Sequence, residues 1–561
     1  MAKAAVLITY REILGKEPEL PALHKILKKY ERREVIFLLA KVNCLLGTWQ
    51  NAPYYELDER FSNYLLGDFH LQLKELRRAS DTRVVFSRFT LLYLIKQACI
   101  ACPEKGAQVN TRRAHSEIGI CCLMANDLVL PFVPKETDGT LERLTNLLPF
   151  SDYISQEHYS MEIGRTQIIL DEILRLPLLA ARSDFVDIEV LFQKYLGLDL
   201  RTFCELSFGC SSKFLKVKLE ELEANPETAV LRSSYFAKSK IPSDKIAQFF
   251  SKTTITESSF VDKVDQSKDR PRNDLTVFQA FPLIEIANEV FACLDPGFII
   301  DKAGRGLYWT LFFALPDEHR GKLASFWGAV FELYINYVLS KSYEAGGIFF
   351  PESKVSNGDG AFDAFILEGR NLIVFEHKSS VIRADAKYAG DPSKLKKELD
   401  LKFIEGDTAG SKGLGQLSKH LARFLRGDKL GDLSSANVDK VYPVLVCLES
   451  TMVTPYLGRY LNERFRTIFR RRDFRQVVTP VFTLGVSDIE NLLGYLQSFL
   501  FSAILESYHS KNKTMLTSIS SSEVPLLKYV KPQRNIAMER FSEFSEIMVK
   551  DLFGDMPEDS V

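Results

Sequence analysis

The sequence predicts a multidomain α+β protein, with a mainly helical N-terminal half and a C-terminal mixed-sheet α/β unit flanked by helices. Three observations favour this class. The chain has 561 residues, which is enough for about two to four domains. Up to about residue 205 the apolar residues recur mainly at helical spacing. After residue 322, helical and strand-like segments alternate, as in a sheet covered by helices.

Residues 1–215 are expected to form a helical domain whose role the sequence does not reveal. Its predicted helices include residues 33–46, 69–78, 83–99, 116–128 and 166–174.

The rest of the chain divides into three predicted parts. Residues 216–275 are expected to be a polar connecting region, because Pro226 and Pro242 interrupt it and residues 261–274 carry few apolar side chains. Residues 276–510 form the predicted α/β domain, with residues 277–315 as its N-terminal extension. Residues 511–561 form a C-terminal helical tail.

The composition and the distribution of charge exclude few classes of protein. The formal net charge is -1, so binding of nucleic acid would depend on a local patch. Charged residues interrupt both the early apolar stretch, at Arg11 and Glu12, and the longest apolar region, at Arg88 and Lys96. We therefore expect a cytoplasmic protein without a secretion signal or a membrane span.

The nine cysteines are scattered along the chain, and we expect them to be reduced thiols. Two pairs invite a zinc interpretation, Cys99 with Cys102 and Cys121 with Cys122. A structural zinc site needs four well-spaced ligands, and both pairs lie in apolar sequence. Small core side chains are therefore favoured over a metal site.

Residues 362–367 and 372–378 are predicted to be two strands joined by a tight turn. Asp363 lies near the start of the first strand, and the second ends in Glu376 and Lys378. Side chains alternate along a strand, so Glu376 and Lys378 point to one face and His377 to the other. If the hairpin places Asp363 beside Glu376, two carboxylates and an ammonium converge. Two carboxylates that close suit Mg²⁺, which prefers oxygen ligands.

A helix is predicted upstream, over residues 322–340, and it carries Glu332 in its middle. The face of Glu332 also holds Ser325, Gly328 and Asn336, at helical spacing. Glycine there costs about 1 kcal/mol of helix stability relative to alanine, so a packing or functional reason is expected for Gly328. The alternative is that Glu332 lies on a solvated stripe.

A second helix is predicted downstream, after a glycine-rich entry at residues 410–415. Gln416, His420 and Arg423 share one face of it, and leucines with Phe424 take the other. The alternative interpretation is an ordinary amphipathic surface helix.

Taken in chain order, Glu332, Asp363, Glu376 with Lys378, and Gln416 resemble the motif of the PD-(D/E)xK, or restriction-endonuclease-like, nuclease superfamily. In that family the aspartate lies on one strand and the Glu-x-Lys on the next. An upstream helix often adds a glutamate, and one large branch adds a glutamine on a downstream helix. This chain departs from the pattern in having Phe362 in place of a proline, and His420 where that branch often has tyrosine.

The resemblance implies that the α/β domain is a PD-(D/E)xK-like nuclease core that hydrolyses phosphodiester bonds, above all in DNA. Mg²⁺, with Mn²⁺ as a substitute, would be held by Asp363 and Glu376, with Glu332 as a further ligand. Lys378 would stabilise the attacking water or the phosphate charge, and Gln416 would orient water or substrate. By analogy, large nucleases of this layout are frequent in prokaryotic anti-phage defence and mobile-element systems.

Two basic segments are candidate nucleic-acid contacts. The first is a polar excursion, residues 379–413, which is rich in lysine and is expected to be a long loop. The second is an arginine cluster from Arg464 to Arg475 interleaved with phenylalanines, because arginine forks match phosphate oxygens. A solvated helix face is the equal alternative for this cluster. The candidate contacts are His420, Arg423, Arg470, Arg471 and Arg472.

Two other functions remain open from the sequence. One is a catalytically silent nucleic-acid-binding regulator that keeps the fold. The other is an interaction scaffold dominated by the helical half, which could also mediate homo-oligomerisation or bind a partner protein. Mg²⁺-dependent degradation of nucleic acid, compared between wild type and Glu376→Ala, separates these from a nuclease.

Overall fold

The computed structural model of the chain describes residues 6–47, 54–79, 83–129, 139–148, 159–215, 229–267, 274–343, 348–351, 362–404, 413–448, 454, 456–470, 473–511, 524–532 and 534–553. The chain divides into two compact units, each with a main sheet of its own. The six-stranded unit comprises Pro134–Val186 and Pro316–Phe544, and the four-stranded unit comprises Ala2–Val133, Asp187–Leu315 and Ser545–Val561. The expected multidomain α+β class is confirmed.

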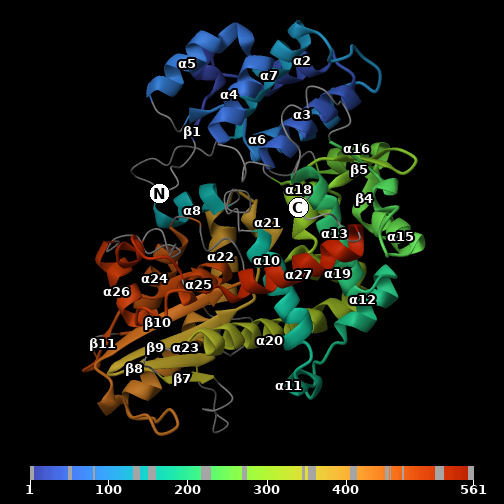
Figure 1. Ribbon diagram of the computed structural model, residues 1–561. Coiled ribbons are helices and arrows are strands. Elements are labelled where there is room, and N and C mark those ends of the chain that lie inside the picture. The colour runs from blue at the N-terminus through green and yellow to red at the C-terminus, as the bar shows by residue number, and fades with distance from the viewer. Residues whose placement is uncertain are drawn as a thin grey trace. The chain divides into compact units, whose positions relative to one another are not determined.

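The six-stranded unit is built around a mixed sheet, as the alternating segments predicted. Its strands run in the order β11–β10–β9–β8–β7, and β12 also pairs with β10. β8 is antiparallel to β7 and β9, whereas β10 is parallel to β9, β11 and β12. Figure 1 shows β8, β9 and β10 side by side in this sheet. The strands are β7 (Ile348–Pro351), β8 (Ala364–Glu368), β9 (Asn371–Lys378), β10 (Lys440–Cys447), β11 (Val477–Val478) and β12 (Phe482–Gly485).

Both faces of this sheet are covered by helices, because its central strands bury side chains on both sides. On one face, Leu372 and Val374 of β9 join a core cluster with residues of α22, α23 and α24. On the other, the ring of Phe375 stacks on that of Phe501 in α26, with 5.9 Å between the ring centroids. The helices are α8 (Thr140–Leu147), α10 (Tyr159–Ile168), the π-helical turn η3 (Ile169–Ile173), α11 (Pro177–Ala180), α20 (Asp317–Ser342), α21 (Ala384–Lys387), α22 (Pro392–Phe403), α23 (Leu414–Leu425), η6 (Ser435–Asn437), α24 (Leu457–Ile468), α25 (Val486–Leu493), α26 (Phe501–Lys511), η10 (Pro525–Leu527) and α27 (Ile536–Phe553), whose last residues belong to the four-stranded unit.

The four-stranded unit combines helices with a sheet in the order β3–β6–β5–β4, and a separate parallel pair joins β1 to β2. Its elements are β1 (Val6–Leu7), α1 (Tyr10–Leu14), α2 (Leu20–Leu27), α3 (Arg32–Gly47), α4 (Tyr54–Leu65), η1 (Gly67–Phe69), α5 (His70–Ala79), β2 (Arg83–Val84), α6 (Arg88–Ala101), α7 (Arg112–Val129), α12 (Ile188–Leu196), α13 (Leu200–Leu215), β3 (Val230–Arg232), η4 (Ser233–Phe236), α15 (Ser243–Thr253), β4 (Thr254–Thr256), α16 (Glu257–Gln266), α17 (Thr276–Ala280), β5 (Leu283–Ala287), β6 (Val290–Cys293), α18 (Pro296–Asp301) and α19 (Gly306–Ala314).

The structure groups the chain differently from the linear division expected from the sequence. Residues 134–186 belong to the six-stranded unit, because the apolar side of α8 packs there: Leu144 and Leu148 share its core cluster with Leu399. Residues 276–315, expected as an extension of the α/β domain, belong instead to the four-stranded unit, where β5 and β6 form the middle of the sheet.

The polar connecting region expected over residues 216–275 is largely folded. Its described part, residues 229–267, supplies two strands of the four-stranded sheet and the helices α15 and α16. In α15 the buried residues are Ile246, Phe249, Phe250 and Thr253, which fall at helical spacing. The exposed polar residues between them outnumber this narrow apolar stripe, and that is why composition alone suggested a linker.

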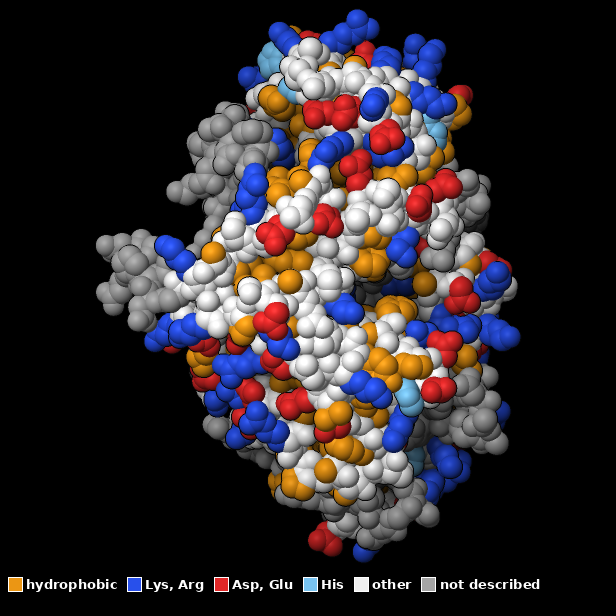
Figure 2. All heavy atoms as spheres, turned by 90° about the vertical axis from the view of Figure 1, so that its right-hand side faces the viewer, with side chains coloured by type: hydrophobic (Ala, Val, Ile, Leu, Met, Phe, Trp, Pro, Cys, Tyr) orange, Lys and Arg blue, Asp and Glu red, His pale blue; other side chains and the backbone are white. Residues whose placement is uncertain are grey.

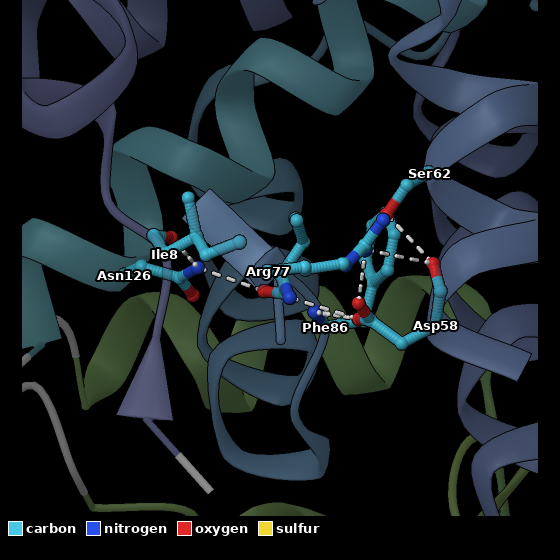
Figure 3. Close-up of polar contacts among 7 residues, drawn as sticks. Ile8, Asp58, Ser62, Arg77, Phe86 and Asn126 are labelled. Atoms are coloured by element: carbon cyan, nitrogen blue, oxygen red, sulfur yellow. Dashed lines mark hydrogen bonds and ion pairs between the residues drawn. The ribbon is translucent and has the colours of Figure 1, made fainter. Parts of the chain in front are cut away.

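A buried carboxylate, Asp58 of α4, organises one part of the four-stranded unit (Figure 3). Its Oδ1 accepts the backbone N–H groups of Val85 and Phe86, each at 2.8 Å, and its Oδ2 pairs with the guanidinium of Arg77. Figure 3 also shows Asn126, whose amide nitrogen donates to the carbonyl oxygens of Ile8 and Val85. These bonds tie β2 to the helices around it.

The remaining expectations about composition concern the surface and the cysteines. On the face drawn in Figure 2, acidic and basic side chains are interspersed, in keeping with the formal net charge of -1. All nine cysteines are buried as free thiols, as expected for small core side chains. Within the part of the chain that the structure describes, none of the helices combines the length and apolar character needed to cross a bilayer.

Candidate active site

The hairpin predicted from the sequence is present, and its turn sets the register. β8 and β9 are joined by Gly369 and Arg370, and Gly369 has a φ of 60°, a conformation that glycine adopts without strain. The pairing runs from Glu368 with Asn371 to Ala364 with Phe375. One step further in this register, Asp363 faces Glu376, so both side chains lie on the same face of the sheet.

Asp363, Glu376 and Lys378 form a buried charged group at the end of this hairpin. Glu376 is 0% exposed and Asp363 is 7% exposed. The Lys378 ammonium lies 2.6 Å from Glu376 Oε1, and its side chain is 15% exposed. Asp363 Oδ2 accepts the backbone N–H of His377 at 2.6 Å. By contrast, apart from this contact with Lys378, neither oxygen of Glu376 accepts a hydrogen bond from the described residues.

Burial and mutual repulsion control the protonation of these groups. Burial raises the pKa of Glu376 well above its usual value, and the neighbouring charge of Asp363 raises it further. Burial also raises the pKa of Asp363. Burial lowers the pKa of Lys378, but the charges of Glu376 and Asp363 outweigh this, and the lysine pKa lies above its usual value. A cation is therefore stabilised at this site, whereas two ionised carboxylates side by side are destabilised.

His377 occupies the opposite face, as alternation along the strand predicted. It is fully buried and lies beside Phe375, with 6.2 Å between the ring centroids. Burial lowers its pKa to about 3, so the imidazole is neutral near pH 7. It is a core side chain, separated from the charged group by the strand itself.

The helix α20 brings its predicted face to this site. A Cβ atom at Gly328 would lie 3.3 Å from Ser379 Oγ, directly after Lys378, so the glycine permits close approach of helix and strand end. Asn336 Nδ2 donates to the backbone oxygen of Asp363 at 3.4 Å. Between them, Glu332 contributes a negative charge that acts on both Glu376 and Lys378. Glu332 therefore belongs to the charged group and not to a solvated stripe.

The helix α23 packs against the same hairpin. Its apolar face, Leu414, Leu417, Leu421 and Phe424, lies in the core cluster with Phe362 and Phe365. Its N-terminus needs Gly413, which has a φ of 54° and whose added Cβ would lie 2.4 Å from the Phe403 carbonyl oxygen.

The polar face of α23 is only partly directed to the site. The ring centroid of His420 lies 6.2 Å from that of Phe362, the residue before Asp363, and Gln416 lies one turn earlier on the same face. Arg423, at the other end of the helix, has its Nε 2.8 Å from Asp428 Oδ2. The structure thus places His420 next to the start of β8, whereas Arg423 is engaged in an ion pair.

The arginine cluster is divided between core, ion pairs and solvent. Phe465 and Phe469 are buried in the core, and their rings stack with 5.2 Å between centroids, so these phenylalanines do not form a platform for bases. Arg464 pairs with the buried carboxylate of Asp400 at 3.0 Å. Arg470 is exposed. Arg471 and Arg472 lie outside the described residues.

The lysine-rich excursion is not a long loop in its described part. Residues 384–387 and 392–403 form α21 and α22, and Leu395, Leu399 and Phe403 of α22 are buried. Lys396 pairs with Asp400 at 2.6 Å, four residues later. Because lysines occupy the exposed side of α22, its apolar stripe was not recognised in the sequence. Residues 405–412 of the excursion lie outside the described residues.

One buried network that supports α20 was not apparent from the sequence. Arg165 of α10 forms two hydrogen bonds to Glu490 of α25, at 2.7 and 2.9 Å, and Tyr334 of α20 donates to the same carboxylate. Its members are separated by 156 and 325 residues along the chain. A pattern of neighbouring residues cannot predict contacts over such separations.

The fit of a divalent cation rests on the state of Glu376. Among the described residues there is no group of three or more His, Cys, Asp or Glu side chains already arranged to hold a metal. However, the carboxylate of Glu376 is buried with the Lys378 ammonium as its one close partner among the described residues, and the negative charges of Asp363 and Glu332 also act on it. One divalent cation would balance that charge, and oxygen donors suit Mg²⁺ or Mn²⁺. Asp363 and Glu376 are the residues that would hold it; Glu332, expected as a further ligand, is not grouped with them as a third donor in this structure.

Comparison with protein-family models, with curated proteins and with solved structures finds no match to this chain.

Proposed function

We propose that the group of Asp363, Glu376 and Lys378 is the active site of a PD-(D/E)xK-like nuclease that hydrolyses phosphodiester bonds in nucleic acid, foremost DNA. The observation that carries this proposal is the buried pair of carboxylates with an ammonium at 2.6 Å from Glu376. A buried charged group without full hydrogen bonding costs stability, so a chain that keeps one has a use for it.

The residues of the chain divide the chemistry as follows. Asp363 and Glu376 would hold the divalent cation, which would supply polarisation of the phosphate and a lowered pKa of a water. Lys378 meets the negative charge that builds up on the phosphate oxygens. Asn336 and Gly328 fix α20 against the hairpin and so keep Glu332 within reach. Gln416 and His420 face the start of β8 and position water or the substrate backbone.

The test is a cleavage panel of plasmid, linear duplex, single-stranded DNA and RNA, each with Mg²⁺ or Mn²⁺. Wild type is compared with Glu376→Ala and Asp363→Ala. Asp439→Ala is a matched control, because Asp439 is an exposed carboxylate beside the same sheet whose partner is Arg370.

We expect wild type and Asp439→Ala to cleave at least one substrate equally well, and both active-site variants to be inactive. Cleavage by Glu376→Ala at the wild-type rate, or no cleavage of any substrate by wild type, would contradict the proposal. Binding without cleavage by wild type would instead favour a silent nucleic-acid-binding regulator.

A further inference from the structure

Lys378 lies where the proposed cation would have to bind. Its ammonium contacts Glu376 Oε1 at 2.6 Å, and the negative charges of Glu376, Asp363 and Glu332 all act on it. Glu376 is wholly buried, whereas the Lys378 side chain that contacts it is partly exposed. Mg²⁺ binds carboxylate oxygens at about 2.0–2.1 Å, closer than the ammonium does.

We propose that Lys378 is a built-in competitor of the divalent cation: its ammonium occupies Glu376 in the metal-free protein and moves away when the cation binds. This inference rests on the proposed function for its cation and extends it to the control of cation loading. Two positive charges at neighbouring positions in a buried site repel each other strongly, because little water screens them. They therefore exclude each other from the same carboxylate oxygen.

The geometry also indicates where the ammonium goes. The Lys378 side chain is partly exposed, whereas the Glu376 side chain is not. Movement of the ammonium away from Glu376 is therefore movement toward solvent, which is the side from which a phosphodiester would approach. Cation binding then has two effects: it takes the place of the ammonium at the carboxylate of Glu376, and it releases Lys378 to meet the substrate.

The first experiment measures binding of Mn²⁺ and of Mg²⁺ by calorimetry, without nucleic acid, to wild type and to Lys378→Met. Methionine keeps an unbranched side chain of similar length but lacks the charge. We expect the variant to bind either ion about tenfold to a thousandfold more tightly, which is the range in which one adjacent charge shifts the affinity of a site for protons. Lys440→Met is the matched control, because Lys440 pairs with Glu506 in the same sheet but outside the site.

The second experiment uses the wild-type protein alone, so that it holds even if Lys378→Met fails to fold. Reductive methylation of lysines is followed by mass spectrometry with and without Mn²⁺. We expect Mn²⁺ to increase labelling of Lys378 and to leave labelling of Lys440 unchanged.

Each outcome decides the inference. Unchanged or weaker ion binding by Lys378→Met overturns it, as does unchanged labelling of Lys378 when the ion is bound. Tighter binding without a change in labelling also overturns it, since the lysine would then act only through its distant field. If wild type binds ions with this competition yet cleaves no nucleic acid, the inference stands and the nuclease proposal falls. If wild type cleaves and Lys378→Met binds ions no better, only the inference falls.

Discussion

Each of the two units buries a carboxylate beside a basic side chain, but the two carboxylates differ in the hydrogen bonds that they accept. Asp58 in the four-stranded unit accepts two backbone N–H groups and pairs with Arg77. Glu376 in the six-stranded unit has only the ion pair with Lys378, and two other carboxylates lie near it. Both side chains are 0% exposed.

This difference also appears in the pKa values of the two carboxyl groups. Hydrogen bonds and the arginine oppose the effect of burial on Asp58, and burial raises its pKa only to about 6. Glu376 lacks that compensation, and burial together with Asp363 raises its pKa well beyond the usual range. A buried carboxylate with so little compensation adds little to stability, which is why we propose that it binds a cation.

The largest expected effect comes from replacing Glu376. Glu376→Gln should lower the cleavage rate by about a hundredfold or more, because an oxygen ligand for the cation is lost from a preorganised site. The free energy of unfolding should stay the same or rise, because repulsion with Asp363 disappears. Rate measurements with saturating substrate and denaturant titrations on the same preparation check both. Strong destabilisation by Glu376→Gln would make this carboxylate structural, like Asp58.

Replacing Asp58 should have the opposite profile. Asp58→Ala leaves Arg77 and the two backbone N–H groups without their acceptor, and should lower the free energy of unfolding by about 3 kcal/mol. The protein that remains folded should cleave at the wild-type rate, since Asp58 belongs to the other unit. Denaturant midpoints and the rate per folded molecule are the measurements. An equal loss of rate and stability in the Glu376 and Asp58 variants would contradict this distinction between the two carboxylates.

The dependence of stability on pH should separate the two groups further. A carboxyl group with a raised folded-state pKa stabilises the protein below its unfolded pKa, and that contribution is lost as pH rises toward the folded value, at about 1.4 kcal/mol per pKa unit. For Asp58 the loss should fall between its usual value of 3.8 and about 6. For Glu376 it should begin near its usual value of 4.5 and extend to higher pH, because burial and the charge of Asp363 raise its pKa.

The measurement is the free energy of unfolding from pH 4 to 9 in the presence of a chelator. Asp58→Asn should flatten the profile between its usual value of 3.8 and about 6, and Glu376→Gln should flatten the decline that begins near 4.5. Identical profiles for wild type and Glu376→Gln would mean that folding does not raise the pKa of Glu376.

A smaller effect is expected where α20 approaches the strand end. Gly328→Ala adds a methyl group 3.3 Å from Ser379 Oγ, so helix and strand must shift by a few tenths of an ångström. We expect a loss of a few fold in cleavage rate, against a gain of up to about 1 kcal/mol in helix stability. Adding Ser379→Ala should restore the rate, because it removes the crowded oxygen. No change with Gly328→Ala would mean that the spacing at Gly328 does not bear on Glu332.

The smallest expected effect is on the binding of nucleic acid through Arg470. In catalytically inactive Glu376→Gln protein, Arg470→Gln should reduce the slope of log affinity against log salt by about 0.9, the value for one neutralised phosphate of duplex DNA. The matched control is Arg112→Gln, an exposed arginine of the four-stranded unit. Fluorescence anisotropy at several salt concentrations provides the slopes. Equal slopes for the two variants would mean that Arg470 is simply solvated.

Local sequence was sufficient for the hairpin and for the order of the elements around it. The turn from Glu368 to Asn371 sets the register, and alternation then places Asp363 beside Glu376 and His377 on the opposite face. Helical spacing also placed Gly328, Glu332 and Asn336 on one face of α20. These predictions succeed because they depend on backbone geometry within a few residues.

The tertiary structure alone decided the burial, the partners and the membership of the units. Asp400 takes Arg464 out of the basic cluster, Arg165 and Tyr334 converge on Glu490 across long separations, and residues 134–186 join the sheet that follows them by about two hundred positions. Such contacts follow from which apolar faces pack together, and that is settled by the whole chain at once. The same packing buries the carboxylate of Glu376 with the Lys378 ammonium as its one close partner among the described residues, and the sequence does not reveal this degree of burial.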